Sequence, residues 1–186
     1  MKKRLILIGL FLMVLLATAC GPKATPAVPP TPAPEEWRPT RNISFECTLE
    51  AEETYVIGEP ANLRFSLHNQ TDRTLYILTW YTPLEGIAGK IFSVTRDGDE
   101  VPYWGIMAKR GDPSRDDYAA VKPGAAVSVV VNLAEDYDLS QAGRYHVEFT
   151  SQLHDVSDDE SSISRKRDDH QPHELSCNTV SFEIVH

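Results

Sequence analysis

Apolar and polar residues alternate along most of the chain after residue 41, which is the period-two pattern of strands with one buried face. In the segment 43–50 (ISFECTLE) every second residue is apolar. The same alternation recurs in 61–69, 75–80, 144–153 and 179–186. A helix would instead repeat its apolar residues at three- and four-residue intervals, so these segments predict strands.

Turn residues separate the predicted strands. Asp97-Gly98 stands between the strand patterns 90–96 and 99–104, and it predicts a two-residue hairpin because both residues tolerate positive φ. Lys122-Pro123-Gly124 predicts a turn before 126–133, a β-branched run typical of a buried strand. A set of about seven to eight short strands separated by turns predicts an all-β fold, an immunoglobulin-like antiparallel β-sandwich.

Helices contribute little to this prediction, since a single helical turn at 135–140 is the most that the pattern supports. The segment Gly143-Arg144-Tyr145 follows that turn and opens a late strand. In immunoglobulin-like sandwiches a tyrosine at this place bonds back to the preceding backbone and closes the corner. Tyr145 is therefore predicted to form a tyrosine corner, the alternative being an ordinary aromatic residue in an alternating strand.

The N-terminus has the order of a bacterial export signal. Cations at residues 2–4 precede an apolar run at 5–16, which is shorter than the roughly 20 residues of a membrane-spanning helix. Ala17-Thr18-Ala19-Cys20 resembles a lipobox, whose cysteine is diacylated after cleavage. We therefore predict a lipoprotein signal peptide at 1–19 and lipidation at Cys20; the alternative is an ordinary signal peptide that releases a soluble secreted protein.

Residues 20–40 are rich in Pro and Ala and form a predicted tether, because such composition favours an extended, semi-rigid spacer. Residues 41–186 then have the length of one domain. The expected location is the cell envelope, with the protein lipid-anchored on the extracytoplasmic face of a bacterial membrane and held off its surface by the tether.

Charge narrows the possible partners. The formal net charge is −9, and loss of the three cations of the signal peptide makes it −12. Nucleic-acid binding requires basic patches, so an acidic domain of this kind predicts no nucleic-acid partner. It also predicts no electrostatic adhesion to anionic lipid, which leaves the N-terminal lipid as the membrane contact.

Cys47 and Cys177 are the thiols that remain once Cys20 is lipidated. An even pair in an exported domain favours a disulfide, and two buried free thiols are the alternative. The stretch HELSC (173–177) begins like the zinc-protease motif His-Glu-x-x-His, but Cys177 replaces the second histidine. Cys177 is therefore assigned to the disulfide, and the stretch is not assigned to catalysis.

The loop 154–175 is rich in residues that can bind metals, but their spacing matches no established metal site and three cations at 165–167 would oppose a divalent ion. We therefore expect a solvated, mobile loop without a metal. No serine lies in a nucleophile motif, and no phosphate-binding glycine pattern occurs. The sequence predicts no catalytic, cofactor-binding or metal-binding residue, and the protein is not expected to be an enzyme.

Four aromatic residues form the predicted binding patch: Trp80, Tyr81, Tyr103 and Trp104. Trp and Tyr near strand ends suit protein hot spots or sugar stacking. Alternation places neighbours on opposite faces, so the alternative is that at least one residue of each pair lies in the core. The loop 105–117 is the best candidate for an exposed inhibitory loop; its Arg110-Gly111-Asp112 resembles an adhesion tripeptide, a match short enough to arise by chance.

Several segments between Ser44 and Ser151 resemble the non-catalytic β-sandwich domain of peptidyl-Lys metalloendopeptidases, the deuterolysin-like proteases. They are Leu67-His68-Asn69, Phe92-Ser93-Val94, the Pro123-Gly124 turn, and Tyr137-Asp138-Leu139-Ser140 before Gly143-Arg144-Tyr145. Bacterial proteinase-inhibitor domains of the BsuPI type share a similar strand, Pro-Gly and strand pattern.

The resemblance implies the fold and an accessory role, since the sequence contains no His-Glu-x-x-His. We therefore expect a non-catalytic lipoprotein that binds a protein or glycan partner. The alternative function is a proteinase inhibitor or a protease-accessory domain.

Overall fold

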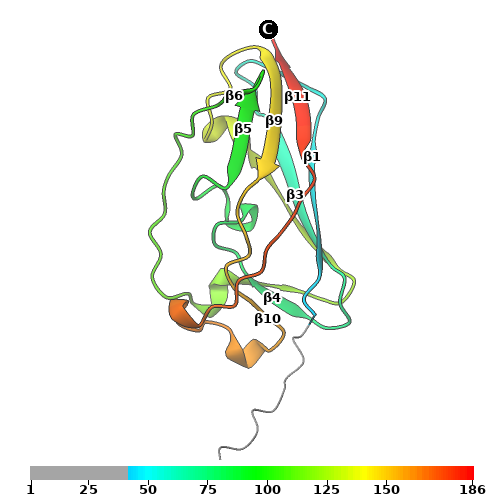
Figure 1. Cartoon of the computed structure of the whole chain (residues 1–186), viewed down its shortest axis with the longest axis vertical. Coiled ribbons are helices and arrows are strands. Elements are labelled where there is room, and N and C mark those ends of the chain that lie inside the picture. The colour runs from blue at the N-terminus through cyan, green and yellow to red at the C-terminus, as the bar shows by residue number, and fades with distance from the viewer. Residues whose placement is uncertain (1–41) are drawn as a thin grey trace, which may run out of the picture. The chain divides into compact units, whose positions relative to one another are not determined.

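A computed structural model describes residues 42–186 (Figure 1). The predicted signal peptide (1–19), the lipidation site Cys20 and the tether (20–40) lie outside the described residues. Among residues 42–186, no helix is long and apolar enough to cross a membrane.

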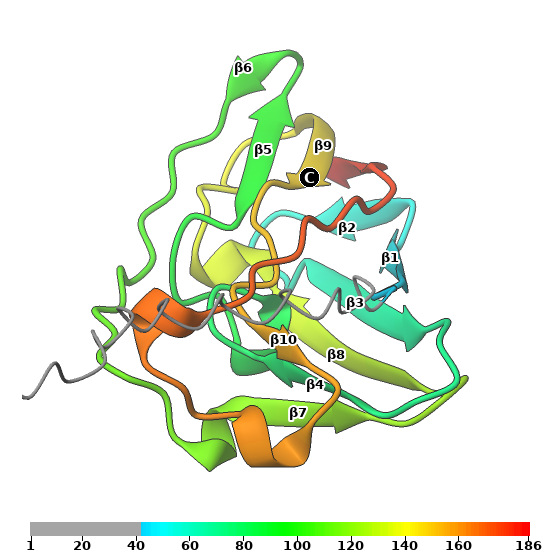
Figure 2. The same ribbon diagram turned by 60° about the horizontal axis from the view of Figure 1, so that its bottom comes forward.

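Three sheets carry the strands, and all strand pairs except β2 with β11 are antiparallel. The first sheet has the order β1 (Phe45–Ala51), β3 (Asn62–Asn69), β8 (Ala126–Asn132). The second has the order β10 (Val156–Ser157), β4 (Leu75–Leu78), β7 (Tyr118–Val121), with β4 in the middle (Figure 2). The third has the order β2 (Thr54–Val56), β11 (Val180–Val185), β9 (Gly143–Phe149), β5 (Phe92–Arg96), β6 (Asp99–Glu100).

The described helices are single 3₁₀ turns in the connections: η1 (Pro83–Glu85), η2 (Arg115–Asp117), η3 (Leu133–Glu135), η4 (Glu160–Ser162) and η5 (Arg167–Asp169). The helical turn expected at 135–140 lies slightly earlier, at η3. Asn132 explains this position, because its side chain accepts the N–H of Ala134 at 3.2 Å and so caps the turn.

The core is built from residues of all three sheets, and aromatic contacts in it join the first sheet to the third. Alternate residues of β3 (Leu63, Phe65, Leu67) are fully buried, as the period-two pattern predicts. Phe65 meets Phe149 of β9 with ring centroids 5.6 Å apart, and Phe149 in turn meets Phe92 of β5 at 5.8 Å. The predicted all-β, immunoglobulin-like sandwich is confirmed. The described residues form eleven strands and not seven to eight, because the sequence pattern does not reveal the short strands β2, β7 and β10.

Two local predictions are also present in the structure. Asp97 and Gly98 have φ of 52° and 95°, and they join β5 to β6 as a two-residue hairpin. The Tyr145 hydroxyl donates to the carbonyl oxygen of Gln141 at 2.7 Å while its ring is fully buried. Tyr145 thus forms the tyrosine corner that fixes the entry to β9.

The prediction of a buried strand at 126–133 is wrong. In β8 the outward residues Ala126, Ser128 and Val130 are exposed, and Val131 is the one valine of this strand that is buried, at 8% exposure. The reason is that the outer face of the first sheet is open to solvent, as the exposed Asn62 and Arg64 of the central strand β3 also show, so the β-branched composition of β8 reflects strand propensity and not burial on both faces.

The expectation of a solvated, mobile loop at 154–175 is wrong for its first part. Asp155 is fully buried, and its carboxylate accepts the hydroxyl of Tyr118 and the backbone N–H of Gln171, each at 2.7 Å. Arg165 Nε lies 3.1 Å from the same carboxylate. A buried charge is tolerated when it is paired and hydrogen-bonded, so Asp155 anchors the loop from inside.

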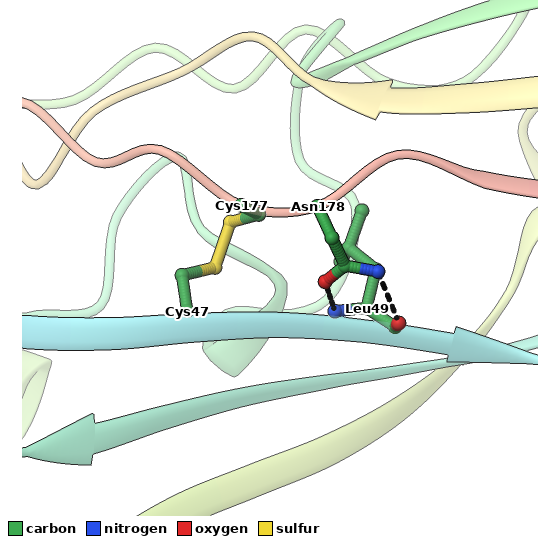
Figure 3. Close-up of a disulfide and its surroundings, with 4 residues drawn as sticks. All are labelled: Cys47, Leu49, Cys177 and Asn178. Carbon is green, nitrogen blue, oxygen red and sulfur yellow. Dashed lines mark hydrogen bonds between the residues drawn. A yellow bond between two sulfur atoms is a disulfide. The ribbon is translucent and has the colours of Figure 1, made fainter.

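The predicted disulfide joins Cys47 of β1 to Cys177, three residues before β11 (Figure 3). Next to it, the side chain of Asn178 bonds to the backbone of Leu49. Asn178 Oδ1 accepts the N–H of Leu49 at 2.8 Å, and Nδ2 donates to its carbonyl oxygen at 3.0 Å. The Asn178 amide thus satisfies the two backbone groups of Leu49 that a further strand beside β1 would otherwise bond.

Reducing the disulfide is predicted to lower the free energy of unfolding by about 4–5 kcal/mol, because the bond closes a loop with a sequence separation of 130 residues. Urea unfolding with and without reductant measures the change. The double variant Cys47→Ser, Cys177→Ser is the control and should unfold identically in both conditions. An unchanged midpoint after both thiols are shown to be free would contradict this prediction.

Candidate interaction surface

Exposed apolar side chains gather on the segment 103–107, which follows β6. Trp104, Ile106 and Met107 are 59%, 68% and 71% exposed. The other exposed large apolar side chains among the described residues are valines on strands β2, β8 and β11. The segment belongs to the long connection between β6 and η2, drawn in green along the left of Figure 1.

The base of this segment rests on the core through Tyr137. Tyr103 and Tyr137 form an isolated antiparallel bridge, and their ring centroids lie 5.1 Å apart. Tyr137 is fully buried and its hydroxyl donates to the carbonyl oxygen of Phe92 at 2.8 Å. The segment is therefore seated on a side chain that is itself held by β5.

Hydrogen bonds fix the backbone of the segment next to η3. The backbone N–H of Trp104 donates to the carbonyl oxygen of Asp136 at 2.9 Å, and its indole Nε1 donates to that of Glu135 at 3.1 Å. The hydroxyl of Tyr103 donates to the carbonyl oxygen of Ile106 at 2.6 Å. The backbone N–H of Trp104 and the carbonyl oxygen of Ile106 are thus bonded within the protein while both side chains are exposed.

Gly105 is required where the segment turns between these two residues. A Cβ at this position would lie 2.2 Å from Asp136 Oδ1 and 2.6 Å from the Tyr103 hydroxyl oxygen. Any side chain at position 105 would displace the Tyr103 hydroxyl, which donates to the carbonyl oxygen of Ile106.

The far end of the segment is held by the connection between β4 and β5. The backbone N–H of Ala108 donates to the carbonyl oxygen of Ala88 at 3.0 Å, and the Tyr81 hydroxyl donates to that of Ala108 at 3.1 Å. Ala88 is buried. The apolar side chains therefore lie on a short stretch that is fixed on both sides.

The ionisable groups at the base are shielded from water. Burial raises the pKa of Asp136, and the neighbouring charge of Glu135 raises it further. Burial also raises the pKa of Tyr103, with a smaller contribution from Asp136. Both shifts have desolvation as their main cause, which is consistent with an ordered base under an exposed tip.

The four residues of the predicted aromatic patch do not form one surface. Trp80 is buried; its Nε1 donates to Asp117 Oδ1 at 3.0 Å, and the guanidinium of Arg110 lies 5.2 Å from its ring centroid. Tyr81 is half-buried and its ring contacts that of His154 at 4.9 Å. Tyr103 is half-buried under the apolar segment, and Trp104 alone of the four is exposed.

The tripeptide 110–112 does not present a free arginine. Arg110 is bonded to Glu85 and lies over Trp80, and its side chain is 24% exposed. An adhesion tripeptide needs an accessible arginine, so this resemblance has no structural support.

Ile106 and Met107 were not selected from the sequence, although they lie within the loop 105–117. Their signal is a pair of adjacent large apolar residues between glycine and alanine, outside any alternating strand. Such a pair cannot be buried by a period-two pattern, and it marks a candidate contact surface.

Among the residues that the structure describes, no group of three or more His, Cys, Asp or Glu side chains is placed to hold a metal ion. In the stretch HELSC, His173 contacts the ring of Phe45 at 6.4 Å and Cys177 is in the disulfide. His173 and Cys177 therefore contact residues of β1, Phe45 and Cys47.

Comparison with known proteins gives one match in sequence. An extracellular protease of Aeromonas hydrophila is 33% identical over 103 residues, which cover 54% of this chain. This chain is similar to part of an extracellular protease. It covers only 30% of that relative's length, so the protease activity belongs to the relative. No protein-family model matches the chain.

Solved structures give weak matches. The CARDB domain of a Pyrococcus furiosus protein, in complex with di-metal ions, matches with a TM-score of 0.33 and 9% identity, over 77% of this chain and 89% of that domain. A β-glucosidase from Listeria innocua in complex with glucose matches with a TM-score of 0.33 and 9% identity, over 76% of this chain and 16% of the enzyme. At these TM-scores the similarities carry no argument about function.

The substitution Gly105→Ala is predicted to destabilise the protein by about 1–3 kcal/mol, the usual cost of inserting a methyl group into packed space. It should also speed amide hydrogen exchange at Trp104 and Ala108, the bonded N–H groups on either side of Gly105, because the Tyr103 hydroxyl must move away from the Ile106 carbonyl oxygen. Thermal unfolding and hydrogen exchange measure the two effects.

Gly111→Ala is the matched control in the same loop, since a Cβ at Gly111 would meet nothing within 4 Å. Equal behaviour of the two variants would contradict the assignment of Gly105 as a packing constraint.

Proposed function

We propose that this protein is a non-catalytic lipoprotein of the cell envelope whose β-sandwich binds a protein partner through Trp104, Ile106 and Met107. The observation that carries the proposal is that these side chains are exposed on a backbone already fixed by internal hydrogen bonds. Large side chains on a pre-ordered backbone lose little entropy on binding, which is the property of interface hot spots.

A protein partner is favoured over a glycan by the composition of the surface. Sugars are bound by flat aromatic rings together with polar groups, and here the exposed neighbours of the one indole are Ile106 and Met107. Isoleucine and methionine offer apolar surface without hydrogen bonds, and methionine adapts to apolar partners of different shape. The glycan alternative is therefore the weaker of the two.

A second candidate is a protease-accessory or inhibitor domain. It is supported by the 33% identity to part of an extracellular protease and by the resemblance to the non-catalytic sandwich of peptidyl-Lys metalloendopeptidases. In this case the protein that meets Trp104, Ile106 and Met107 would be a protease. Arg110 would not serve as the residue recognised by a trypsin-like protease, because it is bonded to Glu85.

Anchoring of the protein rests on the sequence of its N-terminus. Acylation of Cys20 would place several acyl chains on one residue, and more than one chain is needed for stable attachment. The Pro- and Ala-rich residues 20–40 would then separate the sandwich from the membrane and leave the apolar segment free to meet a partner.

The substitution Trp104→Ala is predicted to weaken partner binding about 30-fold or more, the effect of losing a hot spot. It should change stability by less than about 1 kcal/mol, because the indole is 59% exposed and makes one hydrogen bond. Crosslinking and affinity capture from envelope extract identify the partner, and binding of the purified partner is then measured for each variant.

Val130→Ala is the control, since Val130 is an exposed apolar residue, 46% exposed, on β8. A protease among the captured partners, with changed activity in the complex, selects the second candidate. Equal binding by the wild type and Trp104→Ala would exclude this surface from the function.

The substitution Cys20→Ser is predicted to abolish incorporation of an alkyne-labelled palmitate and to move the protein from the membrane fraction to the soluble fraction. Thr25→Ser, in the tether, is the control and should keep both label and membrane attachment. An unlabelled wild-type protein that is cut near Ala19 would instead establish the secreted form.

A further inference from the structure

A second feature, separate from the segment 103–107, lies where the connections after β4 and around η5 meet. A pocket of about 300 Å³ is present there. Its walls are two aromatic residues, one leucine, two arginines and two histidines: Leu78, Trp80, Tyr81, Arg110, His154, Arg167 and His170. No carboxylate lines it, although the chain as a whole is acidic.

The charge balance of this pocket differs from that of its surroundings. The other arginines in the adjacent connections are each paired with a carboxylate: Arg73 with Asp158, Arg110 with Glu85, Arg115 with Glu160, and Arg165 with Asp155. The guanidinium of Arg167 has no carboxylate within ion-pair distance among the described residues. Asp112 Oδ1 accepts the backbone N–H of Arg167 at 3.3 Å, so this carboxylate bonds to the main chain of Arg167 and not to its guanidinium. Nε2 of His170 is buried and has no hydrogen-bond partner among the described residues.

The pKa of His154 is affected by the positive charges of this pocket. Burial lowers the pKa of His154, and the positive charges of His170 and Arg167 lower it further. A bound anion would act in the opposite direction, because it favours the charged form of the imidazole.

The geometry of the pocket is held by Glu85. Its Oε1 accepts the backbone N–H of Tyr81 at 2.8 Å, and Oε2 bonds to Arg110. Tyr81 has a positive φ of 57°, a conformation uncommon for a non-glycine residue, and its ring packs against His154. Glu85 thus orders the wall formed by Tyr81 and Arg110, although it does not itself line the pocket. Its carboxylate pairs with Arg110, whereas the guanidinium of Arg167 makes no ion pair among the described residues.

From this arrangement we infer that the pocket formed by Arg110, Arg167, His154 and His170 is a binding site for a small anion, a carboxylate or phosphate group. Guanidinium groups bind both through charge-assisted hydrogen bonds, and the imidazoles supply further donors. The volume is at the lower end of the range for small-molecule sites, so the ligand is a small acid or the anionic group of a larger molecule.

The test uses the full-length protein and three sodium salts at constant ionic strength: inorganic phosphate, acetate and chloride. The ring resonances of His154 and His170 are followed by NMR during each titration. We expect a saturable shift of both histidines, with the pKa of His154 rising, in phosphate, in acetate or in both, and no saturation in chloride. Saturation by phosphate alone assigns a phosphate ligand, and saturation by acetate alone assigns a carboxylate.

Arg167→Gln provides the decisive variant, because Arg167 is exposed and its removal should not unfold the protein. It should weaken anion binding about tenfold, the usual effect of losing one charge-assisted contact. Lys166→Gln is the matched control: it is adjacent, exposed, equal in charge change and outside the pocket. Absence of saturation in both phosphate and acetate would overturn the inference, as would equal weakening by the two variants.

Discussion

The covalent link between Cys47 and Cys177 is the constraint on which the arrangement of the sandwich depends. It ties β1, in the first sheet, to the segment that leads directly into β11, in the third. Because β11 lies between β2 and β9, fixing its approach also fixes the partners on both of its sides. The contact between Phe65 and Phe149 in the core requires these two sheets to face one another in this register.

The surface features are built from connections and depend on core residues for their order. Tyr137 is fully buried, bonds to β5 and supports Tyr103 under the apolar segment. Asp155 is equally buried and anchors the connection that carries His154 and His170. Each connection is therefore held by a buried side chain, Tyr137 for the first and Asp155 for the second. Rigid scaffolds commonly hold recognition loops in position.

The sequence predicts the parts of this structure that depend on local pattern. Alternation predicts the strands, Asp97-Gly98 predicts the hairpin, and Tyr145 predicts the tyrosine corner. Each of these features is determined by residues close together in the chain. The cysteine pair was predictable for another reason, since a domain that is predicted to be exported and has two thiols has one pairing available.

Prediction fails where the outcome depends on spatial neighbours. The valines of β8 are typical of a buried strand, but composition cannot tell that the outer face of its sheet is left open to solvent. The charges of 154–175 indicate a solvated loop. This prediction misses the burial of Asp155, because its partners Tyr118 and Arg165 are brought to it by the fold and not by the local sequence. The exposure of Ile106 and Met107 likewise depends on which residues Tyr103 and Tyr137 bring together.

The bonds of Asn178 to Leu49 have a consequence for how this protein behaves among copies of itself. An edge strand with free N–H and C=O groups is a template for pairing with another chain, and such pairing begins many forms of aggregation. At Leu49 those groups are already occupied by a side-chain amide, and at Cys47 the adjoining backbone of Cys177 forms a bridge. The outer edge of β1 is therefore closed at its centre, so crowding of many copies on one surface does not turn this strand into a point of self-association.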